Sequence, residues 1–294
     1  MKSVNIIFLS IFLISTNTIL VGQLPVTALY SFDLKADGEG LVLSRPSFLS
    51  GFVSKSYVNQ PHFVNDSEVL ISCDHDRDGF TDILLLNIKN STFSVFCDTK
   101  DISEFSPIMN LTKTHVLTTR IEDDRKTQTV WKYPFNKSNI GINFLPKVEN
   151  PGYFAELNAS QIAVFQVFEP NRLSIWNIET KTLATIDSNI GRCLKVNSKG
   201  QLIYSTKVNG QGVIKRFTPS TNSFEVLGNF DGQDFELLDD DTLIEGRGML
   251  LSFMKISDKS KWVNFADLST LGIKDITRLA YRNGKLLLVN AILK

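Results

Sequence analysis

The residues best suited to chemistry form an acidic loop, Asp-His-Asp-Arg-Asp-Gly-Phe-Thr-Asp, at positions 74–82. Carboxylates occupy its first, third, fifth and ninth positions, and the glycine at the sixth allows a sharp turn. Calcium is bound by hard oxygen ligands in loops with this kind of spacing. The pattern therefore predicts a structural calcium ion that would brace the loop. Its predicted ligands are Asp74, Asp76, Asp78, the backbone carbonyl of Phe80, and Asp82.

The segment after this loop decides which kind of calcium loop it resembles. Position twelve is Leu85, where an EF-hand has a bidentate Glu, and an apolar strand follows in place of a helix. The loop is therefore not an EF-hand. Its spacing resembles the acidic loops of FG-GAP propeller repeats, although those join the first two strands of a blade. Because Asp and Gly are also ordinary turn residues, a metal-free turn between strands stays open.

Catalytic motifs are absent from the sequence. The only histidines are His62, His75 and His115, and no HExxH, Cys-x-x-Cys or G-x-S-x-G pattern occurs. A catalytic triad can still assemble from residues that lie far apart in the chain, so these absences favour a binding protein without excluding an enzyme. No cofactor is required by any pattern found.

Strands that recur along the chain must position these residues. Five strongly apolar segments begin at positions 83, 130, 173, 213 and 250, and each has weaker strand patterns on both sides. The spacing of 37 to 47 residues, with four strands in each unit, is typical of β-propeller blades. Turn residues such as Asn65-Asp66 and Asn283-Gly284 lie between the first and second strands of their units.

The two ends of the chain complement each other. Residues 277–281 and 285–291 supply two strands of a sixth unit, and residues 28–34 and 40–44 supply the missing third and fourth strands. We therefore predict an all-β, six-bladed propeller of four-stranded antiparallel blades, its last blade closed by N-terminal strands. An open solenoid or a pair of β-sandwiches is the alternative, but a solenoid would need capping units that the sequence lacks.

The repeated units resemble those of the TolB-like six-bladed propellers, which are built from WD40-like (PD40) repeats. The resemblance is carried by Glu104-Phe105-Ser106-Pro107, by the strand at 114–120, and by Val130-Trp131-Lys132-Tyr133. Residues 57–63 repeat the start of this pattern one unit earlier. The resemblance implies a scaffold that binds peptides or partners at one end of its channel, often in the bacterial periplasm. Six-bladed relatives also include lactonase-type hydrolases with a calcium ion in the channel, which is the alternative function.

The N-terminus has the pattern of an export signal, because Lys2 precedes a short apolar run at 6–14. We predict a signal peptide at 1–22 and a single propeller domain at 23–294, exported to the periplasm or secreted, with no membrane span in the mature chain. A retained anchor is the alternative. Cys73 and Cys97 fall on strands separated by another strand, beyond disulfide reach, so we expect these and Cys193 to be free, buried thiols.

The charge balance, 31 basic against 31 acidic residues, gives no reason to expect nucleic acid as a partner. We expect a monomer that binds a protein or a small molecule. The loops at 54–60, 98–106, 148–153, 187–192 and 228–234 join successive blades and should share one face, together with loop 74–82. On that face we predict binding residues Tyr57, His62, Phe105 and Tyr153.

Overall fold

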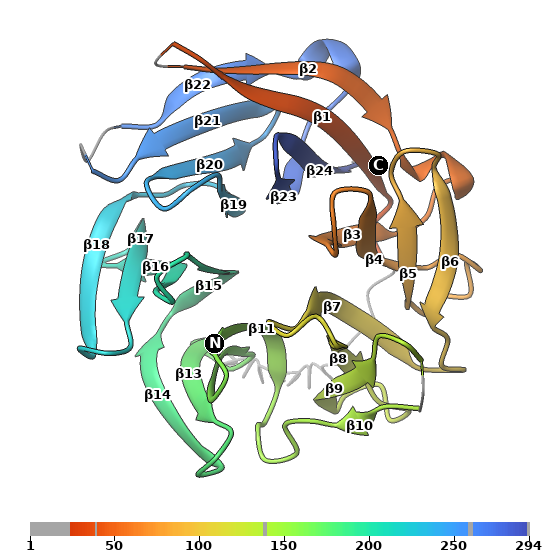
Figure 1. Ribbon diagram of the computed structural model, residues 1–294, viewed down its shortest axis with the longest axis vertical. Coiled ribbons are helices and arrows are strands. Elements are labelled where there is room, and N and C mark those ends of the chain that lie inside the picture. The colour runs from red at the N-terminus through yellow and green to blue at the C-terminus, as the bar shows by residue number, and fades with distance from the viewer. Residues whose placement is uncertain (1–23, 39, 138–139, 258–260, 293–294) are drawn as a thin grey trace, which may run out of the picture.

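The computed structural model describes residues 24–38, 40–137, 140–257 and 261–292. In this part of the chain, six four-stranded antiparallel sheets surround a central axis like the blades of a propeller (Figure 1). The strands of each blade follow one another in the chain, and the innermost strand comes first, except in the blade that closes the ring. The predicted fold class, number of blades and strand order are confirmed.

Five blades are continuous in sequence. Blade 1 contains β3 (Val58–Phe63), β4 (Glu68–Cys73), β5 (Asp82–Asn87) and β6 (Thr92–Cys97). Blade 2 contains β7 (Ser103–Met109), β8 (His115–Ile121), β9 (Gln128–Pro134) and β10 (Ile142–Asn143). Blade 3 contains β11 (Pro151–Asn158), β12 (Gln161–Gln166), β13 (Arg172–Asn177) and β14 (Thr182–Ser188). Blade 4 contains β15 (Ile190–Val196), β16 (Leu202–Val208), β17 (Gln211–Thr218) and β18 (Ser223–Asn229). Blade 5 contains β19 (Asp234–Leu237), β20 (Thr242–Arg247), β21 (Leu250–Lys255) and β22 (Val263–Asp267).

The sixth blade joins the two ends of the chain, as predicted. From the axis outward it contains β23 (Ile276–Arg282), β24 (Lys285–Ala291), β1 (Thr27–Asp37) and β2 (Gly40–Phe48). Strand β1 pairs with β24 from Thr27 opposite Ala291 to Asp33 opposite Lys285. Figure 1 shows the N-terminal strands lying against the C-terminal ones. Two short 3₁₀ helices, η1 (Ser50–Phe52) and η2 (Ser269–Leu271), adjoin this blade and blade 5.

The hydrophobic core lies between the blades. The described residues form six apolar clusters, and each cluster joins two neighbouring blades. In one of them Ile71 and Leu84 of blade 1 pack with Leu287 and Val289 of the closing blade. Because the middle strands are covered on both faces, they read as nearly continuous apolar runs, whereas outer strands such as β14 are largely exposed.

The three cysteines are free and buried, as predicted. Cys73 ends β4 and Cys97 ends β6, with β5 between them in the sheet. Burial raises the pKa of the Cys73 thiol to about 12 and holds that of Cys193 well above its usual value. These thiols therefore behave as small apolar side chains rather than as nucleophiles.

The predicted signal peptide, residues 1–22, lies outside the described residues. Among the residues that are described, no helix is long and apolar enough to cross a membrane.

The loops that link the blades are shorter than predicted. Strand β3 begins at Val58, β7 at Ser103, β11 at Pro151 and β15 at Ile190, all inside the ranges assigned to loops. The first residues of these innermost strands pair irregularly, with register shifts such as that between Asn59 and His62. Because a bulge breaks the alternation of apolar and polar residues, these segments look like loops in the sequence.

Candidate functional site

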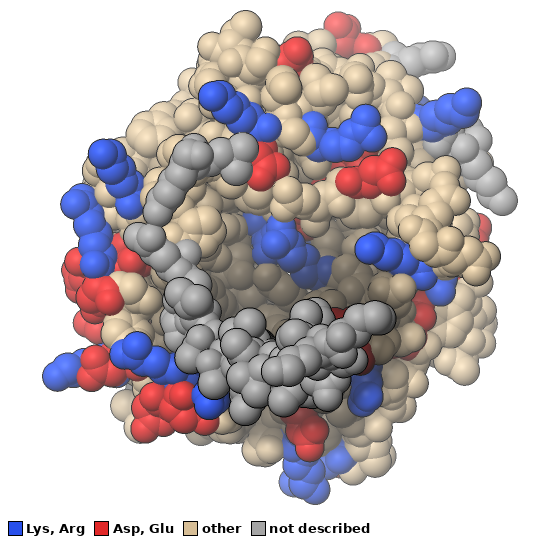
Figure 2. All heavy atoms as spheres, turned by 180° about the vertical axis from the view of Figure 1, so that it is seen from behind, with Lys and Arg blue, Asp and Glu red and all other residues tan. Residues whose placement is uncertain are grey.

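A cavity of about 480 Å³ lies on the propeller axis. All six innermost strands contribute to its wall: β3, β7, β11, β15, β19 and β23. Its size falls in the range usual for small-molecule sites. Figure 2 shows Lys and Arg side chains inside the central hollow, on the face opposite to that seen in Figure 1. The axis of the propeller is therefore a cationic cavity rather than a packed core.

Bulges in the innermost strands shape the cavity wall. Gln60 and Ser106 have positive φ angles, 54° and 53°, and each precedes a proline that lines the cavity. The Gln60 side-chain oxygen accepts hydrogen bonds from the backbone N–H of Ser106 (2.8 Å) and from the Ser72 hydroxyl (3.0 Å). This contact joins blades 1 and 2 at the point where both innermost strands depart from regular pairing.

Two arginines from different blades meet at one carbonyl group. Arg192, on β15, donates from Nη2 to the backbone oxygen of Thr277 at 3.1 Å and to the Gln233 side-chain oxygen at 3.3 Å. Arg278, on β23, donates from Nη1 to the same Thr277 oxygen at 2.9 Å. Both side chains line the cavity, and Arg278 is only 9% exposed. Gly191, next to Arg192, packs closely against Ser205, and a Cβ at Gly191 would overlap the Ser205 hydroxyl.

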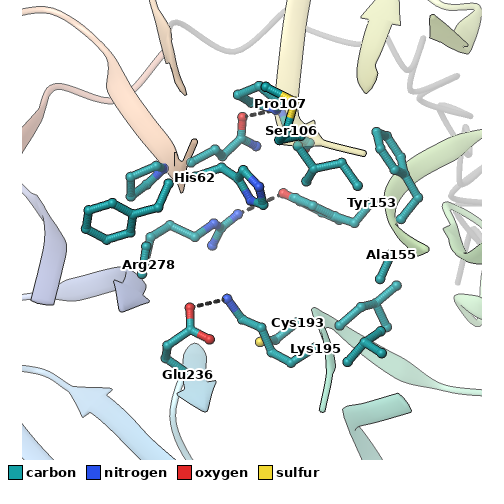
Figure 3. A pocket seen from close by; sticks show the side chains of 18 of the residues that line it. His62, Ser106, Pro107, Tyr153, Ala155, Cys193, Lys195, Glu236 and Arg278 are labelled. Carbon is teal, nitrogen blue, oxygen red and sulfur yellow. Dashed lines mark hydrogen bonds and ion pairs between the residues drawn. The ribbon is translucent and has the colours of Figure 1, made fainter. Parts of the chain in front are cut away.

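Tyr153 holds the second arginine in place. The Arg278 Nη2 atom donates to the Tyr153 hydroxyl at 2.8 Å, and the guanidinium carbon lies 5.4 Å from the centre of the tyrosine ring. Figure 3 shows Arg278 and Tyr153 pointing toward each other across the cavity. An arginine over an aromatic face gains a cation–π attraction in addition to the hydrogen bond. The orientation of Arg278 is therefore fixed by contacts to uncharged groups.

Neither guanidinium has an ion-pair partner within the described part of the chain, where eight ion pairs between Lys or Arg and a carboxylate occur elsewhere. The two nitrogens that share the Thr277 oxygen are at most about 6 Å apart. At an effective dielectric constant of about 20, unit charges at that separation repel by roughly 3 kcal/mol. Burial first, and then the charge of Arg278, lower the pKa of the Arg192 guanidinium. The Asp234 carboxylate favours the charged form of both arginines, so the pair is a cationic centre that is offset only in part and has no ion-pair partner.

The remaining charges of the cavity are matched more closely. Lys195 pairs with Glu236 at 2.6 Å, and Figure 3 shows this pair beside Cys193. Burial raises the pKa of the Glu236 carboxyl, while the adjacent ammonium opposes that rise. His62 also faces the cavity, and burial followed by the charges of Lys195 and Arg282 lowers its pKa to about 4. His62 is therefore a neutral imidazole at physiological pH.

The predicted binding residues fall into two groups. Tyr57, Phe105 and Tyr153 together line a smaller cavity of about 220 Å³, and the rings of Tyr57 and Phe105 meet edge to face with centroids 6.1 Å apart. His62 lines only the larger cavity, and Tyr153 borders both. The structure thus brings three of the four residues together and places His62 farther along β3. Tyr57 is mostly buried, so Phe105 and Tyr153 offer more accessible surface.

The acidic loop joins β4 to β5, between the second and third strands of blade 1 as predicted. It lies beside the start of β3, since the Asp74 N–H donates to the Tyr57 carbonyl at 3.1 Å. His75 contacts Asp82 at 3.2 Å and Asp76 at 3.4 Å, and the Phe80 N–H donates to Asp78 at 3.0 Å. No group of three or more His, Cys, Asp or Glu residues arranged to hold a metal ion occurs among the described residues. Calcium binding by this loop stays a prediction.

Sequence reasoning missed the charged residues of the cavity: Arg192, Lys195, Glu236 and Arg278. Each is a common residue type on an innermost strand, and their contacts join positions as much as 125 residues apart. The one signal that could have found them is their position near the start of an innermost strand: Arg192, Glu236 and Arg278 lie two residues after the first residue of β15, β19 and β23, and Lys195 lies five residues after the first residue of β15. Because the starts of β15 and β23 pair irregularly, that signal could not be read before the structure was known.

The fold and the axial cavity define a six-bladed propeller with a cavity on its axis. No protein-family model and no curated protein matches the sequence. Solved structures do match: a protein assigned as TolB from Agrobacterium tumefaciens has a TM-score of 0.66 at 8% identity, over 92% of this chain and 99% of that chain. TolB from Acinetobacter baumannii gives 0.59 at 10% identity over 92% of this chain, which spans 65% of that protein. A chain of the nidogen/laminin complex gives 0.62 at 9% identity, over 90% of this chain and 98% of that chain. The predicted TolB-like fold is confirmed.

Proposed function

We propose that this protein is an exported binding module that holds a protein partner or small ligand at one end of its central channel. The observation that carries the proposal is the lining of the channel. Three aromatic residues, Tyr57, Phe105 and Tyr153, surround a small cavity that shares Tyr153 with the larger axial cavity. Aromatic side chains beside a few fixed polar groups are typical of binding sites. The nidogen/laminin complex shows a propeller of this fold bound to another protein.

The alternative is a hydrolase with a calcium ion in the channel, and the donor groups of the cavity do not fit it. Its wall contains three carboxylates, and each accepts a protein N–H: Glu156 from Leu111 at 2.6 Å, Asp234 from Leu279 at 2.8 Å, and Glu236 from Lys195 at 2.6 Å. Cationic side chains outnumber these carboxylates in the wall. Calcium requires six to eight oxygen ligands, and this environment repels a cation. The cavity thus favours binding over metal-assisted hydrolysis.

Export is supported by the N-terminal sequence pattern alone. Expression of the full chain with its natural N-terminus, followed by mass spectrometry of the exported protein, tests it. We expect the exported form to begin near residue 23. An exported form that retains Met1 would show that the segment is an anchor instead.

Affinity capture with matched variants tests the proposed binding site. We expect the wild-type protein to retain one partner or ligand, and Phe105→Ala to lose most of it because the substitution removes an aromatic wall of the smaller cavity. Phe224→Ala is the control, since Phe224 is 43% exposed on the outer strand β18. Retention by Phe105→Ala together with loss by Phe224→Ala would place the binding surface on the outside of the propeller and contradict the proposal.

A further inference from the structure

The guanidinium groups of Arg192 and Arg278 keep much of their donor capacity unused. A guanidinium has five N–H donors. Contacts with protein acceptors occupy two donors on Arg192 and two on Arg278, and every acceptor is uncharged: the Gln233 side chain, the Thr277 carbonyl and the Tyr153 hydroxyl. Nε and Nη1 of Arg192 and Nε of Arg278 have no protein acceptor and are not among the buried atoms that lack a partner, so these three nitrogens keep some contact with solvent, and both arginines line the cavity.

The charges around the pair are unbalanced. The cavity wall contains five cationic side chains, Lys113, Arg192, Lys195, Arg278 and Arg282, and three carboxylates, Glu156, Asp234 and Glu236. Lys195 is paired with Glu236, and Arg282 is paired with Asp66 outside the cavity at 2.7 Å. The charge of the Asp234 carboxylate favours the charged form of both arginines. One Asp234 oxygen accepts the Leu279 N–H, and the carboxylate forms no ion pair with either arginine. A net positive centre remains at Arg192 and Arg278.

We propose that the axial cavity binds an oxyanion, a carboxylate or phosphate group of the ligand, between Arg192 and Arg278. This inference rests on the proposed function, since it names the chemistry of the ligand that the channel holds. Arginine pairs carboxylate and phosphate oxygens through two parallel hydrogen bonds, and two adjacent guanidiniums can supply four such bonds. The anion would also relieve the repulsion between the two charges. A neutral or cationic ligand would leave both guanidiniums, one of them on the buried Arg278, without an ion-pair partner.

Titration calorimetry with two probes tests the inference. Succinate and inorganic phosphate, each added to the protein in chloride buffer of constant ionic strength, separate the two possible sources of the oxyanion. We expect at least one to bind at up to millimolar concentration. Arg192→Gln and Arg278→Gln should each weaken binding about tenfold or more, because each removes charged hydrogen bonds to the anion. Arg278→Lys should restore part of the loss in Arg278→Gln.

Arg282→Gln is the matched control, because it removes one positive charge from the same cavity wall but from an arginine already paired with Asp66. We expect it to weaken binding less than about threefold. Equal weakening by Arg282→Gln and Arg278→Gln would show a diffuse potential and overturn the site. Failure of both probes to bind the wild-type protein would overturn it as well.

The buried Arg278 makes folding a separate question, so circular dichroism of each variant accompanies the titrations. If Arg278→Gln fails to fold, the test rests on calorimetry of Arg192→Gln, whose side chain is partly exposed, and on the melting temperature of the wild-type protein. The wild-type melting temperature should rise in succinate or phosphate relative to chloride, because a ligand that binds only the folded state stabilises it. No such rise overturns the inference. If neither anion binds but Phe105→Ala still loses its partner, the oxyanion site is wrong and the proposed function stands.

Discussion

Arg192 and Arg278 donate to the same backbone oxygen, that of Thr277, at 3.1 and 2.9 Å. Arg192 belongs to blade 4 and Arg278 to the blade that closes the ring, so blade 5 separates them along the chain and around the axis. Strand β23, which carries Arg278, belongs to the sheet that the N-terminal strands β1 and β2 complete. The blade that closes the ring therefore also supplies one arginine of the pair.

Replacing Tyr153 with Phe should loosen Arg278. The substitution removes the hydroxyl that accepts the Arg278 Nη2 hydrogen bond at 2.8 Å and keeps the ring beneath the guanidinium. We expect oxyanion affinity to fall roughly three- to tenfold, with a stability loss of only about 1 kcal/mol. Calorimetry and urea unfolding measure the two effects. Unchanged affinity in Tyr153→Phe would mean that the hydroxyl does not orient Arg278.

Ring closure should depend on apolar contacts of β1. Phe32 is 1% exposed and packs in the cluster between the closing blade and blade 5. Phe32→Ala should lower the free energy of unfolding by about 3–5 kcal/mol through the cavity that it leaves. Val42→Ala on β2 is the control, since Val42 is 45% exposed, and its effect should stay within about 0.5 kcal/mol. Similar losses in both variants, measured by urea unfolding, would contradict a closure held by interblade packing.

Much of this architecture follows from local patterns in the sequence. The third strands are apolar runs between good turn residues. The strands left over at the two ends, residues 28–34 and 285–291, can be assigned to one blade because their patterns are those of a third and a second strand. The absence of a disulfide between Cys73 and Cys97 can be predicted from strand order alone, because another strand lies between the two strands that carry them. The linking loops were predicted too long because bulges at residues such as Gln60 and Ser106 hide the beginning of each innermost strand.

The candidate site could be predicted only in part. Tyr57 directly precedes β3, and Phe105 and Tyr153 are the third residues of β7 and β11, so the repeat itself brings them to the smaller cavity. Arg192 and Arg278 meet through a backbone carbonyl, and no rule of spacing connects two arginines to an acceptor that any residue could supply. His62 lines the larger cavity and Tyr57 the smaller one, and the irregular pairing of β3 lies between them.

Two buried glutamates should make stability depend on pH. Burial raises the pKa of Glu104 to about 7 and that of Glu245 to about 7, and one oxygen of each lacks a partner. The folded protein therefore holds these protons to higher pH than the unfolded chain, whose glutamates have pKa values of about 4.3. The stabilisation is complete below about pH 4.3 and is lost as pH rises through about 7.

Glu104→Gln tests this dependence, because glutamine stays neutral at every pH. Urea unfolding at pH 5 and pH 8 should show a loss of roughly 1–3 kcal/mol per glutamate in the wild-type protein. The variant should lose about half as much, since Glu245 still titrates. An equally large loss in wild type and variant would show that Glu104 does not carry the effect.

The calcium hypothesis for loop 74–82 predicts heat on titration with millimolar calcium and an increase in melting temperature, both abolished by Asp76→Ala. Asp76 is mostly exposed and contacts His75, so its substitution should leave the fold intact. A wild-type protein that gives no heat with calcium would show that the loop is a metal-free turn held by the contact between His75 and Asp82.

Site-specific photo-crosslinking tests the central claim most directly, which is that the channel and not the outer surface is the binding site. Benzoylphenylalanine would replace Phe105 at the smaller cavity in one protein and Phe224 on the outer strand β18 in another. Mass spectrometry of the irradiated, exported proteins should find one dominant adduct at position 105 and none of that mass at position 224. The same adduct at position 224, with none at position 105, would contradict the account.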